Sequence, residues 1–350
     1  MGDQRAAGIA WTDQTWNPIR GCSRVSEGCR HCYAETVAAR FSWPAQRGAP
    51  NVETGEIEGG RGAGPYHGLA TAKGWTGEVR LIEEHLADPL RWKRPRRVFV
   101  NSMSDLFHER VPDEWIDRIF AVMALSPRHT FQVLTKRPER MRAQLHRRGM
   151  YDGVLRAAED LRRAFPRTTR APVSDPTLHG LPNVWLGVSV EDQRTADERI
   201  PLLLETPAAV RFVSYEPALE PVDFLGLINR RCKTEHPFQA SCRLVEHGQT
   251  GIDWLIVGGE SGPGARWFEI EWARSTIAAC RAAGVACFLK QLGARPCDGF
   301  VEGAQPSAAG PLERAMVPVP LRLAARKGGD PAEWPEDLRV REFPEAGRPA

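Results

Sequence analysis

The feature that most constrains the fold is a short apolar run, rich in β-branched and aromatic residues, that ends in polar residues and recurs along the chain. Such continuous apolar runs are typical of strands buried on both faces of a parallel sheet. Candidate helices lie between the runs, for example over residues 112–125 and 270–283, the second closed by Gly284. The runs lie at residues 98–100, 131–134, 184–188, 210–213, 254–257 and 285–289.

Alternating strands and helices predict an α/β fold with a parallel sheet. With a further strand before Cys22 the count reaches about seven, which favours a full or partial βα (TIM-type) barrel over a simple doubly wound sheet. We predict a barrel domain over residues 1–295, with long loop insertions at about 42–75 and 226–253. The C-terminal extension, 296–350, is rich in Pro, Ala, Arg and Glu, and we expect it to be partly disordered.

Composition narrows the class of protein. With 350 residues, 42% hydrophobic and 26% charged, the chain has an ordinary globular composition and enough length for a large core. No run approaches eighteen apolar residues, and the N-terminus lacks a secretory signal, so we expect a cytoplasmic protein without a membrane partner. The oligomeric state stays open. Cysteines in that compartment should be reduced thiols or metal ligands.

Three of the eight cysteines lie within eleven residues and form the strongest chemical signal. Cys22, Cys29 and Cys32 make a C-x6-C-x2-C loop that contains Gly28 and follows Gly21. Soft thiolates favour iron–sulfur clusters or zinc. Three cysteines on a cubane of four irons leave one iron without a protein ligand, and that iron can bind a substrate or cofactor.

Two other interpretations of this loop stay open. Structural zinc would need a fourth donor, and no second C-x-x-C motif exists. Inert buried thiols are the plainest alternative, and we also expect the five remaining, dispersed cysteines to be buried or loop thiols rather than a second cluster. The candidates for a fourth zinc ligand are His31, Cys280, Cys287 and Cys297, and the dispersed set also includes Cys232 and Cys242.

Several short motifs, taken together, resemble known families. The loop, with His31 before its last cysteine, resembles the cluster loop of radical S-adenosylmethionine (SAM) enzymes, whose common spacing is C-x3-C-x2-C. A closer resemblance, from about residue 9 to 293, is to the phage-associated three-Cys-motif family. Its motifs here are Asn17-Pro18, Cys29-x-x-Cys32-Tyr33-Ala34-Glu35, residues 102–108, 134–140 and 187–191, Glu216-Pro217, and residues 258–262.

These resemblances imply a radical-SAM-like barrel enzyme that binds a [4Fe-4S] cluster and SAM. Reductive cleavage of SAM would give a 5′-deoxyadenosyl radical, with electrons from an external donor of flavodoxin or ferredoxin type. Asp105, with Ser102 and Ser104, would contact the methionine amino group. Ser189 and Glu191 would hold ribose hydroxyls and the methionine carboxylate.

The segment Gly258-Gly259-Glu260-Ser261-Gly262 follows another predicted strand. Its glycines permit close approach and its polar groups could bind an adenine or ribose edge. A tight turn leaving the strand is the alternative. No Gly-Lys-Ser/Thr follows, so the segment does not resemble a phosphate loop.

Charged residues after three other strands are our candidates for catalysis: Lys136, Glu216 and Lys290. Either lysine could hold the SAM carboxylate or a substrate phosphate, or could simply neutralise a neighbouring glutamate. Glu216 could act as an acid or base, or make a structural hydrogen bond. His108 could line the pocket near Asp105, although a lone histidine is more often structural.

Charge distribution suggests a polyanionic partner. The net charge is only +3, but residues 128–170 carry eleven Arg and one Lys against four acids, and residues 91–97 add five bases. Together with the phage association that the resemblance implies, these segments lead us to expect a nucleic acid or nucleotide as substrate, with a merely solvated basic face as the alternative. A different class stays open: a non-catalytic nucleic-acid-binding protein stabilised by zinc or an Fe–S cluster, or a redox sensor.

Overall fold

The computed structural model describes residues 9–44, 49–50, 57–58, 63–178, 180–228, 251–307 and 310–345. The chain forms two compact units. The first comprises mainly Thr12–Val133 and Tyr151–Val173, and the second mainly Leu134–Met150 and Ser174–Ala350 together with Gly8–Trp11. The predicted boundary at residue 295 falls inside the second unit. Cys232, Cys242 and most of the predicted insertion at 226–253 lie outside the described residues, as do several stretches of the insertion at 42–75.

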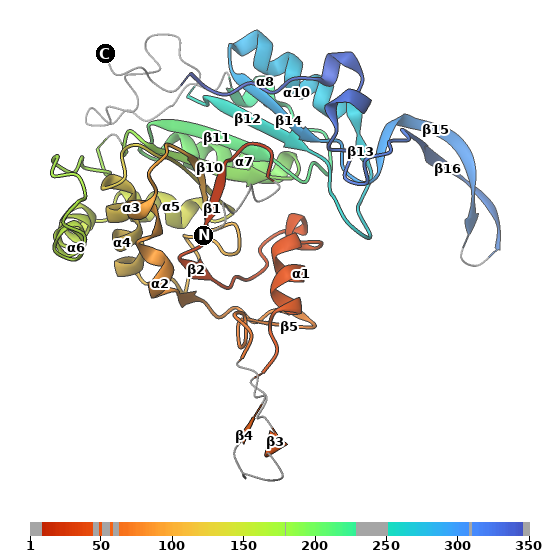
Figure 1. The fold of residues 1–350 in the computed structure, drawn as a ribbon. Helices are drawn as coiled ribbons and strands as arrows, with labels where there is room; N and C mark the ends of the chain where they lie inside the picture. Colours follow the sequence, from red (N-terminus) through yellow and green to blue (C-terminus); the bar gives the residue numbers. More distant parts are fainter. Residues whose placement is uncertain are drawn as a thin grey trace. The chain divides into compact units, whose positions relative to one another are not determined.

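Seven strands form one sheet in the hydrogen-bonded order β1-β8-β9-β10-β11-β12-β14. Figure 1 shows β10, β11, β12 and β14 of this sheet side by side. The pairs β1/β8, β8/β9, β10/β11, β11/β12 and β12/β14 are parallel. All six apolar runs are strands of this sheet, and β1 is the additional strand expected before Cys22. The predicted α/β fold with a parallel sheet is confirmed, and a strand order that follows the chain is the one a partial βα barrel has. The bounds are Gln14–Trp16 (β1), Arg97–Val100 (β8), Thr130–Thr135 (β9), Val184–Val190 (β10), Val210–Tyr215 (β11), Trp254–Gly258 (β12) and Ala286–Gln291 (β14).

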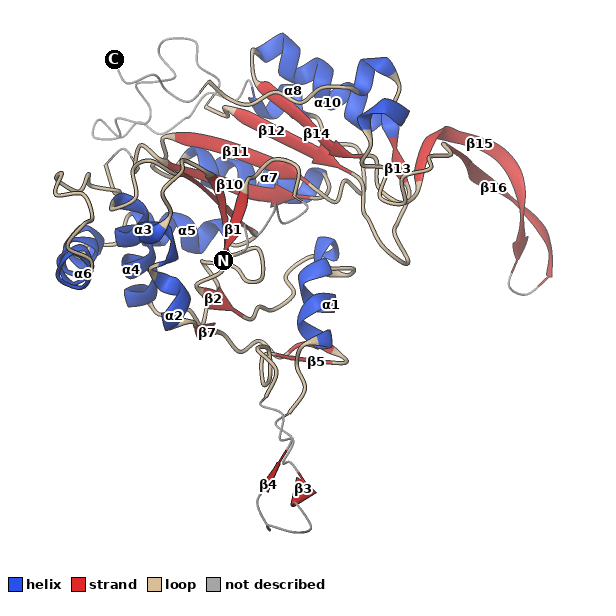
Figure 2. Cartoon of the chain, viewed as in Figure 1, coloured by secondary structure: helices blue, strands red, loops and turns tan. Residues whose placement is uncertain are grey.

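The helices alternate with these strands along the chain (Figure 2). α4 and α10 match the two helices predicted from sequence, and Gly284 ends α10 in the left-handed conformation with φ of 68°. No described helix has the length and apolar character that crossing a bilayer requires. The helix bounds are Tyr33–Arg40 (α1), Glu83–Leu86 (α2), Asp88–Arg91 (α3), Asp113–Ala124 (α4), Pro138–Leu145 (α5), Met150–Ala164 (α6), Gln193–Leu204 (α7), Phe224–Ile228 (α8) and Ile270–Ala283 (α10).

Between β1 and β8, the first unit consists of short helices and short strand pairs. α1 packs its buried Ala34 and Ala38 against Tyr66, Leu69 and neighbouring apolar side chains, which anchors the helix that follows Cys32. A 3-10 turn, η1, spans Glu27–Cys29. The short strand pairs are β2 (Ile19–Arg20) with β7 (Arg80–Leu81), β5 (Ala70–Thr71) with β6 (Gly74–Trp75), and β3 (Ala49–Pro50) with β4 (Ile57–Glu58).

In the second unit, the core centres on the fully buried Trp254 of β12. Its ring contacts those of Trp11, at 6.1 Å between centroids, and Phe343, at 5.3 Å. β10, β11 and β12 are buried at every position, which explains their uninterrupted apolar character. The C-terminal extension begins with a long antiparallel hairpin of β15 (Pro296–Ser307) and β16 (Gly310–Pro320). β15 also pairs in parallel with β13 (Phe268–Glu269). Two 3-10 turns follow, η3 (Pro331–Glu333) and η4 (Glu336–Leu338).

Candidate functional site

The cysteine loop of the first unit starts at a fixed point of the backbone. Gly21, directly after β2, has φ of 97°, and a Cβ there would lie 2.1 Å from the Glu78 carbonyl oxygen. Only glycine tolerates both conditions. Cys22 follows, Cys29 ends η1, and Cys32 is the residue immediately before α1. The three thiols therefore project from a loop whose two ends are set by backbone structure.

The loop thiols differ from the other described cysteines. Cys22, Cys29 and Cys32 are partly exposed, whereas Cys280, Cys287 and Cys297 are buried, and none of the six forms a disulfide. Burial raises the pKa of the Cys32 thiol, while the backbone amides of Glu35 and Ala34 at the start of α1 act in the opposite direction. The interpretation as inert buried thiols thus suits Cys280, Cys287 and Cys297, whereas the loop thiols are less buried.

Glu35 clamps the loop onto α1. Its buried carboxylate accepts hydrogen bonds from Arg24 Nε at 3.1 Å and Nη2 at 2.5 Å, and from the backbone N–H of Trp75 at 2.9 Å. Gly74 makes room for this carboxylate, because a Cβ at that position would lie 2.4 Å from Glu35 Oε1. Arg24, between the first two cysteines, is thereby tied to the helix after the third. Sequence reasoning quoted Glu35 only as part of a motif and missed Gly74.

His108 holds the other side of the loop. Its Nδ1 accepts a hydrogen bond from the backbone N–H of Arg110 at 3.2 Å, which leaves Nε2 as the protonated nitrogen of a neutral ring. Nε2 contacts the hydroxyl of Ser23 at 2.9 Å, and that hydroxyl donates to Glu109 Oε1 at 3.2 Å. The imidazole is fully buried. His108 therefore positions the residue next to Cys22.

The serines predicted to contact the methionine part of SAM take part in local structure. Ser102 donates from its hydroxyl to Asn17 Oδ1 at 3.2 Å, and Ser104 donates to the Ile19 carbonyl at 2.9 Å. Ser104 also forms a parallel bridge with Gly21. These bonds join the segment after β8 to the segment that leads into the cysteine loop. The two serines of this predicted site therefore support the loop.

Asp105 and Asn101 flank that segment and are both buried. Asp105 Oδ1 accepts a hydrogen bond from the Phe107 backbone N–H at 2.9 Å. Asn101 has a left-handed backbone, with φ of 59°, and its Oδ1 accepts from the Ile19 N–H at 3.4 Å. Within the described residues its Nδ2 has no hydrogen-bond partner. A strained backbone and an unsatisfied buried donor at a strand end mark Asn101 as a candidate ligand contact, which the sequence signalled only by an Asn directly after a strand.

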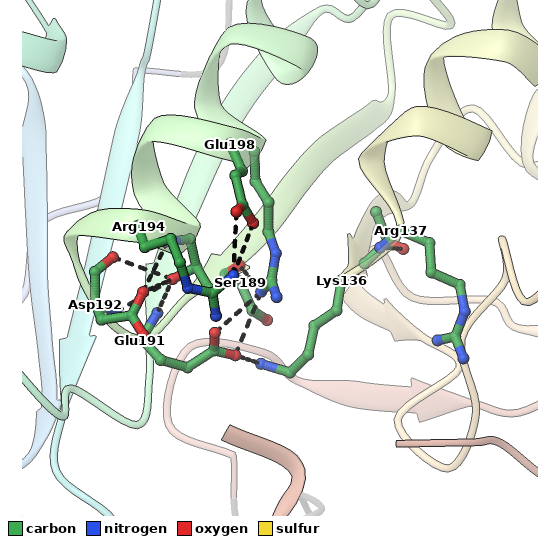
Figure 3. Close-up of polar contacts among 10 residues, drawn as sticks. Lys136, Arg137, Ser189, Glu191, Asp192, Arg194 and Glu198 are labelled. Carbon is green, nitrogen blue, oxygen red and sulfur yellow. Dashed lines mark hydrogen bonds and ion pairs between the residues drawn. The ribbon is translucent and has the colours of Figure 1, made fainter. Parts of the chain in front are cut away.

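In the second unit, the predicted SAM ligand Glu191 lies in an ionic network after β10 (Figure 3). Its carboxylate, 1% exposed, pairs with Lys136 Nζ and with Arg199 Nη1 at 3.1 Å. Arg199 also donates to the Ser189 carbonyl at 2.7 Å. Glu191 is therefore neutralised by two cations, and the trio carries one surplus positive charge. Asp192 caps α7 by accepting from the Thr195 N–H at 2.7 Å, which fixes the helix that carries Arg199.

A second pair joins the ends of β11 and β14. Lys290 Nζ lies 2.6 Å from Glu216 Oε1, and Gln291 Nε2 lies 3.4 Å from the same oxygen. β12 lies between these two strands in the sheet. Gly258 at its end has no side chain, and a Cβ there would come within 3.5 Å of Glu216 Oε1. The absence of a side chain at Gly258 leaves room for the pair to span β12.

The rest of the Gly-Gly-Glu-Ser segment is also shaped by packing. A Cβ at Gly259 would lie 2.5 Å from the Leu292 carbonyl oxygen, so this glycine permits close approach of the backbone after β14. Glu260, buried, accepts from Arg266 Nη2 at 2.7 Å and Nε at 3.0 Å. Ser261 is partly exposed. The tight-turn interpretation accounts for the two glycines and for Glu260.

Comparison with known proteins adds a family but no activity. A family model described as "Protein of unknown function (DUF5131)" matches residues 6–316. The chain belongs to this family. No curated protein and no solved structure matches it. The motif resemblances to radical SAM enzymes and to phage-associated proteins therefore stay predictions.

The cysteine loop of this DUF5131 protein supplies thiol donors of the kind that iron–sulfur clusters and zinc prefer. Within the described residues, no three His, Cys, Asp or Glu side chains are arranged around a single point as one metal ion requires. A four-iron cluster has a different requirement, because each thiolate binds a different iron. Three partly exposed thiols on one loop, none in a disulfide, meet that requirement in number and type.

Proposed function

We propose that this DUF5131 protein is an iron–sulfur enzyme of the radical SAM type, with Cys22, Cys29 and Cys32 as ligands of a [4Fe-4S] cluster and SAM on the open iron. The observation that carries the proposal is the contrast within one loop. Arg24 and Ser23 are bound to fixed partners, Glu35 and His108, whereas the three thiols between and beside them remain partly exposed. Partly exposed thiols on a loop held at both ends are available to bind a ligand.

When bound, such a cluster would supply the electron that cleaves SAM to a 5′-deoxyadenosyl radical. The chain's own residues would orient the ligands. The Arg24–Glu35 pair and the Ser23–His108 bond would hold the loop while thiolates bind iron. Asn101 would offer its unsatisfied amide N–H to an acceptor on the cofactor. An external flavodoxin- or ferredoxin-type donor would provide the electron.

In this proposal, the polar groups of the second unit have roles that differ from those predicted from the sequence. Lys136 is paired with Glu191, and Lys290 with Glu216, so neither lysine is an isolated charge. Lys136 and Arg199, which flank the Glu191 carboxylate, are the cations of this network that would interact with an anionic group of a ligand. The neutral pair of Lys290 and Glu216 would instead exchange hydrogen bonds or a proton.

The proposal is tested by anaerobic reconstitution with iron and sulfide, followed by metal analysis and electron paramagnetic resonance of the reduced protein with and without SAM. We expect about four irons per chain, a signal that shifts on SAM addition, and release of 5′-deoxyadenosine. The single variants Cys22→Ala, Cys29→Ala and Cys32→Ala should each lose most of the iron. The matched control Cys280→Ala changes a cysteine outside the loop and should keep it.

Three results would overturn this proposal. Tightly bound zinc without SAM binding would favour a metal-stabilised nucleic-acid-binding protein. A cluster that responds to redox state but not to SAM would favour a sensor. Equal iron loss in Cys280→Ala and the loop variants would show that the loop thiols are not the ligands.

A further inference from the structure

A basic surface of the first unit is formed by an arginine before β9, two arginines in the last turn of α6 and two arginines after that helix. We call it the arginine surface and define it as Arg128, Arg162, Arg163, Arg167 and Arg170. It contains two hollows, of about 400 and 370 Å³, which both include Thr168 in their lining. The larger is lined by Arg162, Arg163 and Arg170, among others, and the smaller by Arg128 and Arg167.

Three segments distant in sequence meet here. Arg128 Nη1 donates to the Lys93 carbonyl at 3.4 Å, and the Arg91 guanidinium lies 5.1 Å from the centre of the Phe165 ring. Arg162 donates to the carbonyls of Thr169, at 3.2 Å, and Ala171, at 2.6 Å. That last pair of bonds shapes the loop that carries Arg167 and Arg170. These contacts hold the segments that carry the arginine surface in place.

The charge of this surface is incompletely neutralised. Arg163 pairs with Asp160 at 2.8 Å and with Glu159 at 3.8 Å. Arg167 and Arg170 are exposed and form no ion pair with any described residue. Residues 134–150, which the sequence grouped with this basic segment, belong to the second unit instead. The arginine surface therefore comprises fewer residues than the basic segment 128–170, and all of its positive charge lies in the first unit.

The place of the arginine surface in the first unit sets a minimum length for any substrate that also reaches the cysteine loop. Residues 91–96 and Arg128 precede β8 and β9, so they lie at the amino ends of these parallel strands. The cysteine loop and Ser102 follow β2 and β8, and Ser104 bridges to Gly21 beyond the carboxyl end of β8. Four residues of β8 span about 13 Å. A single molecule that contacts both the arginine surface and the cysteine loop must extend past the whole length of β8.

We propose that the arginine surface binds the phosphodiester backbone of a nucleic-acid strand, so that a polymer and not a free nucleotide is the substrate of the proposed function on which this inference rests. Guanidinium groups match phosphate oxygens in geometry and charge. Two adjoining cationic hollows suit successive phosphates of one strand. None of the large exposed apolar side chains among the described residues lies in residues 89–96, 125–129 or 162–171, so membrane insertion has no anchor there.

The test is fluorescence anisotropy of the full chain with a labelled single-stranded DNA or RNA of about 20 nucleotides, over a series of salt concentrations. We expect Arg167→Ala/Arg170→Ala to weaken binding about tenfold at 0.1 M salt and to lower the slope of log K against log salt by about two. Arg167→Lys/Arg170→Lys should retain most of the affinity, since it keeps the charge. The matched control, Arg322→Ala/Arg326→Ala, removes two exposed arginines of the second unit and should bind normally.

The outcomes separate this inference from the proposed function. A Cys22→Ala/Cys29→Ala/Cys32→Ala variant that lacks iron but binds nucleic acid would leave the inference standing while the enzyme proposal fails. Unchanged affinity and slope in Arg167→Ala/Arg170→Ala, with iron binding and SAM cleavage intact, would overturn the inference alone. Competition by free nucleotides at concentrations comparable to the strand, or binding only to anionic phosphatidylserine vesicles, would also overturn it.

Discussion

The cysteine loop of the first unit and the strand-end network of the second unit were both expected to bind a cofactor, and they are built in opposite ways. In the network, Glu191 and Glu260 are buried and each is matched by arginine or lysine. In the loop, charged and polar residues are matched but the thiols remain partly exposed. A side chain whose bonding capacity is used within the chain stabilises the fold. A side chain that stays partly exposed on a rigid support is the better candidate to bind a cofactor.

The largest effect is expected from Glu191→Gln, which tests whether the ionic network stabilises the second unit. The substitution leaves Lys136 and the buried Arg199 without their counter-charge, so we expect the second unit to lose about 3 kcal/mol of unfolding free energy. Urea denaturation followed by intrinsic fluorescence measures the loss. The control Glu198→Gln removes an exposed carboxylate that pairs with Arg194 on the same helix, and it should cost less than about 1 kcal/mol. Equal losses would mean that the network is not a stabilising element.

A smaller effect is expected from Glu35→Gln in the cysteine loop. The neutral amide keeps the shape but loses the charge-assisted bonds to Arg24, which should cost about 1 to 2 kcal/mol. Because Arg24 lies between the first two cysteines, the variant should also bind less iron during reconstitution. Normal iron content in a destabilised variant would show that the clamp supports the fold without ordering the thiols. The control Glu27→Gln changes an exposed glutamate within the same loop.

The smallest effect concerns pH. Burial lowers the pKa of His129 below its ordinary value of 6.5. The folded protein therefore binds this proton more weakly than the unfolded chain, so stability is complete above about pH 6.5 and declines as the pH falls below it. Denaturation midpoints at pH 7.5 and 5.5 should differ less in His129→Gln than in the parent protein. The control His67→Gln, an exposed histidine of the same unit, should leave the difference unchanged.

The strands were predictable because their environment is uniform. β10, β11 and β12 are buried at every position, and a strand buried on both faces has a continuous apolar sequence. The hairpin of β15 and β16 was not predicted. Its first strand reads Pro-Cys-Asp-Gly-Phe-Val-Glu-Gly-Ala-Gln-Pro-Ser, with two prolines and two glycines and no regular alternation. Periodicity therefore identified the sheet and not the extension.

The candidate site was predictable in position but not in partnership. Lys136, Glu191 and Glu216 were correctly assigned to strand ends, because polar residues after apolar runs mark them. Their partners are not local: Lys136 meets Glu191 across fifty-five positions, and Lys290 meets Glu216 across seventy-four. Gly74 and Asn101 were missed for the same reason. The space required by a carboxylate and the lack of a partner for an amide depend on neighbours that spacing does not reveal.

The packing around Trp254 has a consequence for synthesis. Its ring contacts Trp11 near one end of the chain and Phe343 near the other, and its indole N–H donates to the Glu342 carbonyl at 2.9 Å. The second unit cannot complete its core until residue 343 has left the ribosome. Most of the first unit, in contrast, has been translated by residue 173. The cysteine loop, which belongs to the first unit, is therefore translated long before the core of the second unit is complete.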